Sequence, residues 1–299
     1  MISPSVLRKG DLVALVAPAR KVALAELRTA AEILKSWGLE VLYPEGLFLE
    51  DHQFAGSDSD RVKQIQFSLD NTEVKALLCV RGGYGTSRII DALDFTVFLQ
   101  KPKWMIGFSD FTVMLNHLYN LGVTSVHAPI ALLLHQNIEV QKKMKAILFD
   151  STYSNSFTLP YHSLNQLGVV EGSIIGGNLS VLVNQIGTAS FPNLQNGILF
   201  IEDLDEYLYH IDRMMVQLDR IGVFKQISGL LIGHMSGMHD NKIPFGKTAY
   251  QIIYSIIAKY KLTVAFGFPI GHEENNLPIV VGERMRLHVT SLETRLTKI

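Results

Sequence analysis

The first half of the chain alternates short apolar runs with segments whose apolar residues recur at helical spacing. The apolar runs, which predict buried strands, cover 12–17, 39–43, 76–80 and 104–107. The helical patterns cover 24–37, 58–69, 87–92 and 111–121. Parallel strands need crossover connections, so this alternation predicts a mainly parallel sheet with helices on both faces. We therefore expect an α/β fold.

The second half has a less regular pattern. Strand-like segments cover 169–175, 198–201, 230–232, 264–266 and 284–289, and helical patterns cover 179–186, 207–221 and 247–260. The stretch 136–166 loses its periodicity after Leu148 and is typical of a connection between domains. We expect an N-terminal parallel-sheet domain over 1–150, a linker over 151–170, and a C-terminal mixed β/α domain over 171–299.

The composition is that of an ordered globular protein. The 299 residues are 47% apolar and 18% charged, which allows a large core and two domains. The net charge of −1 gives no electrostatic reason to expect a nucleic acid or a membrane as partner. The single cysteine, Cys79, excludes an intrachain disulfide and a multi-cysteine metal site. It lies in an apolar run, so we expect a buried thiol.

The N-terminus superficially resembles a signal peptide, because Arg8 and Lys9 precede the apolar run 12–17. Asp11 interrupts its start, and the run is too short for a typical signal sequence. No apolar run approaches the roughly 18 residues of a membrane span. We therefore expect a first buried strand here and a cytoplasmic location.

Ser109 follows the apolar run 104–107 at the point where a helical pattern begins. A serine at such a turn is exposed at the carboxyl end of the sheet, where open α/β sheets bind ligands. The N–H groups of the helix start could bind an oxyanion. The segment is similar to a nucleophile elbow, although Phe111 replaces the last glycine of Gly-x-Ser-x-Gly. The alternative is that Ser109 or Asp110 caps the helix.

A glycine turn, Arg81-Gly82-Gly83-Tyr84-Gly85, follows the apolar run 76–80. Glycines allow a sharp turn and close approach to a ligand. The turn could bind a phosphate, supply an oxyanion N–H beside Ser109, or bind nothing. It lacks the spacing of a dinucleotide fingerprint and the Gly-Lys-Ser/Thr of a Walker loop. A nucleotide-binding oxidoreductase is therefore disfavoured.

Glu202 and Asp203 end the apolar run 198–201. These carboxylates could orient a histidine, bind a metal or begin a turn, and because Asp205 and Glu206 follow, they could also belong to a solvated acidic face. Metal binding is disfavoured because no His-x-x-x-His or compact cluster accompanies them.

His272 follows Gly271 at the start of a loop that contains acidic and Asn residues. A histidine in such a loop can act as a general base. Most of the other nine histidines are expected to be structural or exposed.

Several separated segments together resemble the LD-carboxypeptidase family of serine peptidases. In order, they are 54–58 with Arg61, 81–85, 103–110, 176–180, 199–203 and 271–272 with 277–278. This family includes muramoyl-tetrapeptide carboxypeptidases and microcin C immunity peptidases. The resemblance spans nearly the whole chain, from 12 to 287. One departure is Ala17-Pro18-Ala19-Arg20, which lacks the serines often found after that proline.

The resemblance implies a catalytic triad whose members come from two domains. It maps the nucleophile to Ser109, the acid to Glu202 and the base to His272. The site is then expected at the domain interface. The chemistry needs no cofactor and no metal, and family members suggest a homodimer.

The resemblance also implies an oxyanion hole and groups that bind the substrate. The oxyanion donors would be backbone N–H groups of Asp110, Gly82 and Gly83. A carboxypeptidase must bind a terminal carboxylate, and Arg81 or Arg88 could do so in a bidentate manner. Arg81 could equally brace the turn. Asn178, in the segment 176–180, is expected to bind substrate.

Three hypotheses follow. The first is a serine-type LD-carboxypeptidase that removes the terminal D-alanine of a murein tetrapeptide in cell-wall recycling. The second keeps the chemistry but cleaves a microcin C-like peptidyl-nucleotide, with Tyr207 and Tyr209 as candidates for nucleobase binding. The third is a non-catalytic muropeptide-binding protein, against which the intact Ser, Glu and His argue.

Overall fold

The computed structural model describes all 299 residues, which divide into two compact units. The first unit comprises Met1–Tyr153 and Leu277–Val280, and the second comprises Ser154–Asn276 and Val281–Ile299. The chain thus returns briefly to the first unit near its end. No helix in either unit has the length and apolarity that crossing a membrane would require.

The first unit is built on a sheet in the order β11-β5-β4-β3-β1-β2. Its strands are β1 (Leu12–Val16), β2 (Glu40–Leu42), β3 (Val74–Cys79), β4 (Trp104–Gly107), β5 (Ser125–His127) and β11 (Ile279–Val281). The strands β1 to β5 pair in parallel. Neighbours β1, β3 and β4 therefore end at one edge of the sheet, where the segments after them can meet.

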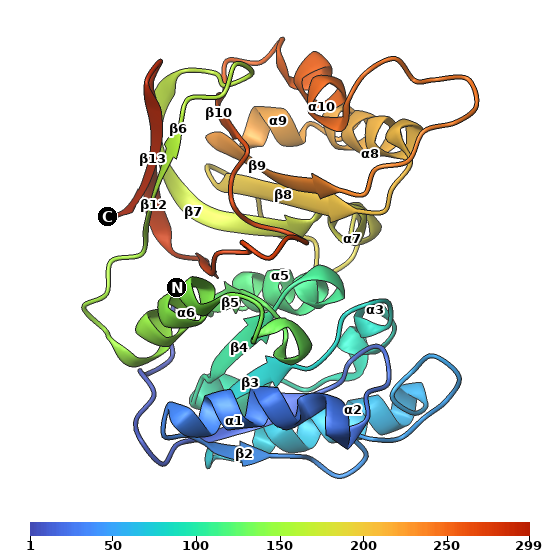
Figure 1. The fold of residues 1–299 in the computed structure, drawn as a ribbon, viewed down its shortest axis with the longest axis vertical. Coiled ribbons are helices and arrows are strands. Elements are labelled where there is room, and N and C mark those ends of the chain that lie inside the picture. The colour runs from blue at the N-terminus through green and yellow to red at the C-terminus, as the bar shows by residue number, and fades with distance from the viewer. The chain divides into compact units, whose positions relative to one another are not determined.

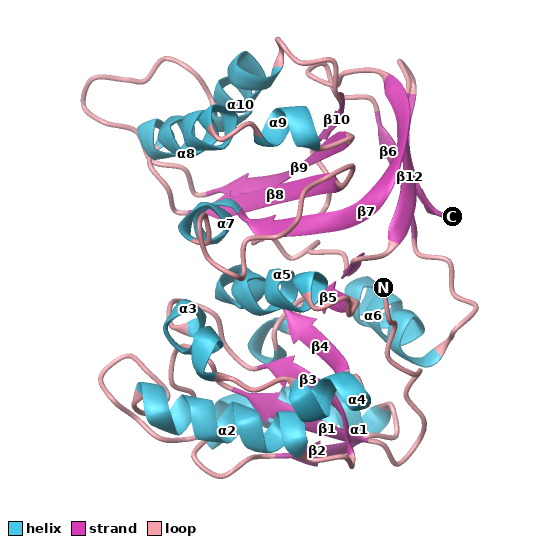
Figure 2. Ribbon diagram, turned by 180° about the vertical axis from the view of Figure 1, so that it is seen from behind, coloured by secondary structure: helices cyan, strands magenta, loops and turns pink.

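Helices cover both faces of this sheet: α1 lies nearest the viewer in Figure 1, and α2 and α4 lie nearest in the reverse view of Figure 2. The α-helices are α1 (Arg28–Ser36), α2 (Asp58–Asp70), α3 (Thr86–Ile89), α4 (Thr96–Gln100), α5 (Thr112–Asn120) and α6 (Ile138–Phe149). Short 3-10 helices are η1 (Leu24–Leu27), η2 (Ile90–Ala92), η3 (Ser109–Phe111) and η4 (Ala131–Leu133). Cys79 is fully buried, as expected.

The second unit has a mixed sheet in the order β10-β9-β8-β7-β12-β13-β6. Its strands are β6 (Ser156–Pro160), β7 (Gly168–Asn178), β8 (Ile198–Leu204), β9 (Gly229–Ser236), β10 (Thr263–Phe266), β12 (Arg284–Val289) and β13 (Glu293–Lys298). The pairs from β10 to β7 are parallel, and those from β7 to β6 are antiparallel.

The helices of the second unit are α7 (Leu179–Asn184), α8 (Leu208–Arg220), α9 (Val223–Gln226) and α10 (Ala249–Ile257). Of these, α8, α9 and α10 gather on one side of β8 and β9 (Figures 1 and 2). The central strand β8 is buried along nearly its whole length, which explains its continuous apolar sequence.

The α/β class and the parallel N-terminal sheet are confirmed, but the stretch 136–166 is more ordered than expected. It contains α6 and β6. The side chain of Asn137 accepts hydrogen bonds at the start of α6, which buries Val140, Met144 and Ile147 at helical spacing. The strand β6 pairs only with β13, at the edge of the sheet, and its sequence pattern is correspondingly weak.

Candidate active site

Ser109 lies between β4 and α5, at the carboxyl end of a central strand. Its φ angle is +62°, a left-handed conformation that is uncommon for residues other than glycine. No side chain caps η3 or α5, so the interpretation of Ser109 or Asp110 as a cap of its own helix is wrong. The strained backbone instead presents Ser109 at a sharp strand-to-helix turn, as in a nucleophile elbow.

The glycine turn lies directly against Ser109. A Cβ atom added to Gly82 would lie 3.3 Å from the Oγ of Ser109, so this approach favours glycine. The N–H groups of Gly82, Gly83 and Asp110 donate to no other group of the chain. These donors beside a strained serine are available to bind an oxyanion, although their use for that purpose stays a prediction.

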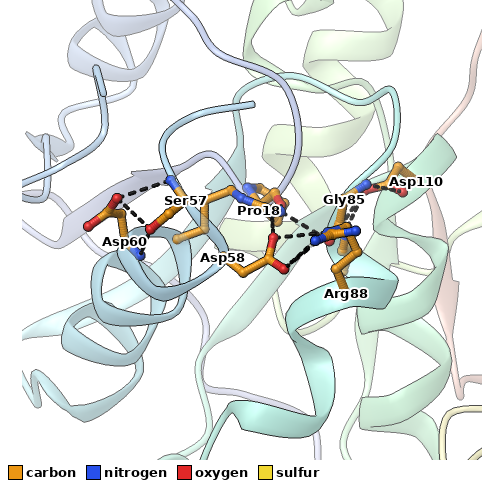
Figure 3. A network of polar contacts seen from close by, with 9 residues as sticks. Pro18, Ser57, Asp58, Asp60, Gly85, Arg88 and Asp110 are labelled. Atoms are coloured by element: carbon orange, nitrogen blue, oxygen red, sulfur yellow. Dashed lines mark hydrogen bonds and ion pairs between the residues drawn. The ribbon is translucent and has the colours of Figure 1, made fainter. Parts of the chain in front are cut away.

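Two buried side chains hold the other end of the turn, at Gly85. The carboxylate of Asp110 accepts from the N–H of Gly85 at 3.2 Å, and from Thr86 N at 2.9 Å and Oγ1 at 2.5 Å. Nη1 of Arg61, a fully buried arginine, donates to the carbonyl of Gly85 at 3.1 Å and to that of Pro18 at 2.5 Å. Figure 3 shows Gly85 between Pro18 and Asp110. Gly85 is thus held at both its N–H and its C=O.

The pKa of Asp110 reflects this burial. Removal from water raises the pKa of its carboxyl group, while the hydrogen bonds from Thr86 and Gly85 and the charge of Arg61 lower it. Burial outweighs these contributions, so the pKa of Asp110 lies above its ordinary value.

Arg61 is connected to the surface through Asp58, at the start of α2. Asp58 accepts from Arg61 and also from Nε and Nη2 of Arg88, at 3.0 and 2.7 Å (Figure 3). Ser57 and Asp60 form a reciprocal capping box at this helix start. Arg88 is consequently engaged by Asp58.

Arg81 is bound less tightly than Arg88. Its Nη1 lies 3.5 Å from Glu26 and 3.3 Å from the carbonyl of Lys21, and its side chain is 38% exposed. Its expected role in carboxylate binding stays a prediction.

Replacing Gly85 by alanine should destabilise the first unit. The added Cβ would lie 2.7 Å from Arg61 Nη1, 2.8 Å from Ala19 Cα and 3.0 Å from Pro18 O, all held by the surrounding structure. Overpacking of this kind costs about 2–3 kcal/mol. Gly122 is a matched control, because it also has positive φ but no atom within 4 Å of an added Cβ. Urea unfolding should show a loss of only about 1 kcal/mol for Gly122→Ala. Equal losses for the two variants would contradict the steric explanation.

In the second unit, Glu202 and His272 form a buried acid–histidine pair. Nδ1 of His272 lies 2.7 Å from Oε2 of Glu202, and the side chains are 13% and 0% exposed. Gly271, with φ +123°, precedes the histidine, and an added Cβ there would lie 3.0 Å from the same carboxylate oxygen. Only glycine leaves this space, which explains the residue before His272.

The pKa of His272 is raised above its ordinary value. Burial alone would lower it, but the charge and hydrogen bond of Glu202, with the charges of Asp203 and Glu273, outweigh burial. The second carboxylate oxygen of Glu202 is buried without a hydrogen-bond partner. Because the pair is desolvated, the carboxylate interacts strongly with any positive charge on the imidazole.

Asp203 is buried beside Glu202, where the register of β8 against β9 shifts. It accepts hydrogen bonds from Asn178 Nδ2 at 2.8 Å, Ser180 N at 2.9 Å and Leu204 N at 2.9 Å. Burial and the neighbouring charge of Glu202 raise the pKa of Asp203 to about 7. Asp203 thus connects the end of β8 to the start of α7.

Asn178 has a structural role at this junction. It is opposite Glu202 in the parallel register, and its Oδ1 accepts from Val181 N at the start of α7. Its side chain is buried. The expectation that Asn178 binds substrate stays a prediction.

Two other acid–histidine pairs occur in the second unit, His210–Glu206 and His239–Asp205, each at 2.5 Å. Their histidines are 30% and 50% exposed, so solvent screens these pairs more than the His272 pair. No group of three or more His, Cys, Asp or Glu residues is arranged to hold a metal ion.

The contacts that Arg61, the carboxylate of Asp110 and Asp203 make in the structure were not predicted from the sequence. Arg61 and Asp110 lie in segments that carry the family resemblance, but their hydrogen bonds to Gly85 join residues 24 and 25 positions apart. Only the folded sheet edge brings them together.

Comparisons with known proteins identify the family of the chain. The family model described as the LD-carboxypeptidase N-terminal domain matches residues 13–128, and the model of the LD-carboxypeptidase C-terminal domain matches residues 171–287. The chain is 32% identical over 294 residues to the probable murein peptide carboxypeptidase of Bacillus subtilis, covering 95% of this chain and 91% of the relative.

Solved structures share the fold. The muramoyltetrapeptide carboxypeptidase of Oxalobacter formigenes has a TM-score of 0.87 and 28% identity, covering 96% of this chain and 98% of that one. The microcin C7 self-immunity protein MccF has a TM-score of 0.86 and covers 99% of this chain and 98% of that one. Its identity is 19%, so this similarity concerns the fold alone.

Proposed function

The chain belongs to the LD-carboxypeptidase family of peptidases, and on that premise we propose that it is a serine-type LD-carboxypeptidase acting on a murein tetrapeptide. The reaction hydrolyses the peptide bond to the C-terminal D-amino acid, D-alanine. The observation that carries the proposal is the buried Glu202–His272 hydrogen bond of 2.7 Å, in a chain whose Ser109 has strained backbone geometry.

The proposed first step is attack of Ser109 Oγ on the scissile carbonyl carbon. A neutral hydroxyl is a weak nucleophile, so His272 must accept its proton. Since Nδ1 of His272 is bonded to Glu202, Nε2 is the nitrogen that accepts it. Glu202 holds the required tautomer and stabilises the imidazolium. The proposal requires Ser109 Oγ and His272 Nε2 to reach hydrogen-bond distance, about 2.6–3.2 Å, during the reaction.

The remaining steps follow from this transfer. The imidazolium returns the proton to the leaving D-alanine nitrogen, and an acyl-enzyme on Ser109 is left. Water, activated by His272, then releases the shortened peptide. The N–H groups of Gly82, Gly83 and Asp110 are the proposed donors to the oxyanion in both steps, and loss of one such donor typically lowers the rate by about 10²–10³.

Further parts of the proposal concern the surroundings of the reaction. We propose that the enzyme acts in the cytoplasm, in recycling of cell-wall peptides, and forms a homodimer. Arg81 and Asn178 are proposed contacts to the substrate. These points are supported by the resemblance of the sequence to the family.

The second candidate function is cleavage of a peptidyl-nucleotide by the same triad. The observation that favours it is an exposed aromatic pair at the start of α8. Tyr207 and Tyr209 are each 43% exposed, with ring centroids 5.6 Å apart. Exposed aromatic rings can stack on a nucleobase.

The deciding experiment compares the two substrates on the same enzyme. Chromatography of the products measures hydrolysis of each substrate. We expect release of free D-alanine from a murein tetrapeptide, with kcat/KM well above that for a peptidyl-nucleotide. A kcat/KM that favours the peptidyl-nucleotide would support the second function. Tight binding of the tetrapeptide without hydrolysis would favour the non-catalytic alternative.

A further inference from the structure

We propose that Arg20 binds the terminal carboxylate of the substrate, and so selects peptides with a free C-terminus. This inference rests on the proposed carboxypeptidase function and adds a specificity-determining residue to it. Arg20 lies in Ala17-Pro18-Ala19-Arg20, the segment that departs from the common family pattern. The family resemblance therefore implied no role for this side chain.

The first observation is the place of Arg20 in the sheet. The segment that contains it follows β1, the glycine turn follows β3, and Ser109 follows β4. These strands are parallel neighbours in the order β4-β3-β1. Their carboxyl ends meet at one edge, where ligands bind in open α/β sheets. Arg20 therefore enters the candidate site from the strand next to the turn.

The second observation is contact between Arg20 and the turn. A Cβ atom added to Gly83 would lie 2.6 Å from both Cδ and Nε of Arg20, so the guanidinium stem crosses directly over Gly83. The adjacent Gly82 lies against Ser109, because a Cβ atom added to Gly82 would lie 3.3 Å from Oγ. One residue of the turn therefore contacts the nucleophile and the next contacts Arg20.

The third observation is that Arg20 is exposed and its guanidinium makes no hydrogen bond or ion pair within the chain. The other arginines near the turn are engaged. Arg61 is buried against Gly85 and Asp58, Arg88 is bound by Asp58, and Arg81 bonds to Lys21 and Glu26. Among the arginines at the turn, Arg20 is therefore the one whose guanidinium N–H groups can all donate to a ligand.

The backbone of Arg20 is held in place although its side chain is not paired. Arg20 forms a β-bridge with Phe54, with Ala55 N donating to Ala19 O and Lys21 N donating to Gln53 O, both at 3.0 Å. The side chain therefore starts from a fixed position. A substrate that binds it must order only the side chain, which limits the entropy lost on binding.

The chemistry of the substrate matches this position. In a terminal D-alanine, the carboxylate carbon is three bonds from the scissile carbonyl carbon, which places the two atoms within about 4 Å of each other. The group that binds the carboxylate must then lie beside the oxyanion donors. A guanidinium fits a carboxylate with two parallel hydrogen bonds, so the fork of Arg20 suits this ligand.

The test measures binding in the inactive Ser109→Ala protein by calorimetry, with two ligands: the murein tetrapeptide as free acid and the same peptide as C-terminal amide. Arg20→Gln should weaken binding of the acid about 10–100-fold, the range for a charged hydrogen bond, and leave binding of the amide within about twofold. Lys21→Gln is the matched control, since it removes the same charge from the next residue, whose amine pairs with Glu50. It should change neither affinity by more than about twofold.

The contrary outcomes are distinct. Equal affinities for acid and amide in the Ser109→Ala parent, or an Arg20→Gln protein that still prefers the acid as strongly, would overturn the inference. Loss of acid binding in Arg81→Gln but not in Arg20→Gln would transfer the role to Arg81. Hydrolysis of the tetrapeptide by Ser109→Ala is a separate outcome, which would refute the serine mechanism of the proposed function rather than the role of Arg20.

Discussion

Replacement of Ser109 by alanine should reduce kcat for release of D-alanine by at least about 10⁴-fold, since the nucleophile of a serine triad carries most of its catalysis. The substitution removes only Oγ, and the φ of +62° at this position strains alanine and serine alike. Folding should therefore be unchanged. The measurement is steady-state hydrolysis of a murein tetrapeptide, with thermal unfolding to confirm the fold.

Ser36 provides the matched control for this variant. It is an exposed serine at the end of α1, and its hydroxyl bonds only to the carbonyl of Ile33. Ser36→Ala should retain kcat within about twofold, as is usual for a surface substitution. A fluorophosphonate probe should label the wild type and Ser36→Ala but not Ser109→Ala. Unchanged hydrolysis by Ser109→Ala would refute the covalent mechanism.

The main strands and most of the long helices could be predicted because each follows from local pattern, but α6 was missed within the stretch 136–166. Continuous apolar runs such as 198–201 indicate strands buried on both faces, and β8 is such a strand. The strands β5, β6, β11 and β13 were not predicted. β5 and β11 have three residues each, too few for a periodic signal. β6 and β13 lie at the antiparallel side of the sheet, where long-range pairing defines the strand.

Family membership, predicted from separated motifs, is confirmed by the matches to both LD-carboxypeptidase domain models. The sequence also allowed Glu202 and His272 to be proposed as partners, although they lie 70 residues apart, and the structure brings them to 2.7 Å. The support around Gly85 could not be predicted. Arg61 and Asp110 bond there because neighbouring strands end at one edge, and no local pattern encodes that contact.

Replacement of Glu202 by glutamine should lower kcat by about 10³–10⁴-fold, because an amide no longer stabilises the imidazolium and can favour the wrong tautomer of His272. The side chains are nearly the same size, so the buried space between Gly233 and Gly271 stays filled. Steady-state kinetics should show the loss in kcat with a smaller change in KM. Glu206→Gln is the matched control, since Glu206 bonds to His210 in the more exposed pair of the same unit.

The pH dependence separates an electrostatic role of Glu202 from a structural one. The base must be neutral, so kcat/KM falls as pH drops through the pKa of His272, which Glu202 raises above 6.5. In Glu202→Gln the charge is lost and burial remains, so this acidic limb should move to lower pH.

Stability should respond to the same charge. A raised histidine pKa stabilises the fold below pH 6.5, and this stabilisation is lost as pH rises through the folded-state pKa. Between pH 6 and pH 8 in urea unfolding, the wild type should therefore lose stability relative to Glu202→Gln, at most about 1.4 kcal/mol per pH unit for each titrating group. Asp203, whose pKa of about 7 is raised by burial and by the charge of Glu202, adds to this loss in the same direction. Glu202→Gln could instead show a reduced kcat, with the same pH dependence of kcat/KM and of unfolding free energy as the wild type. That result would show that Glu202 does not stabilise the charge on His272. The acid of the proposed triad would then have to be assigned to another residue.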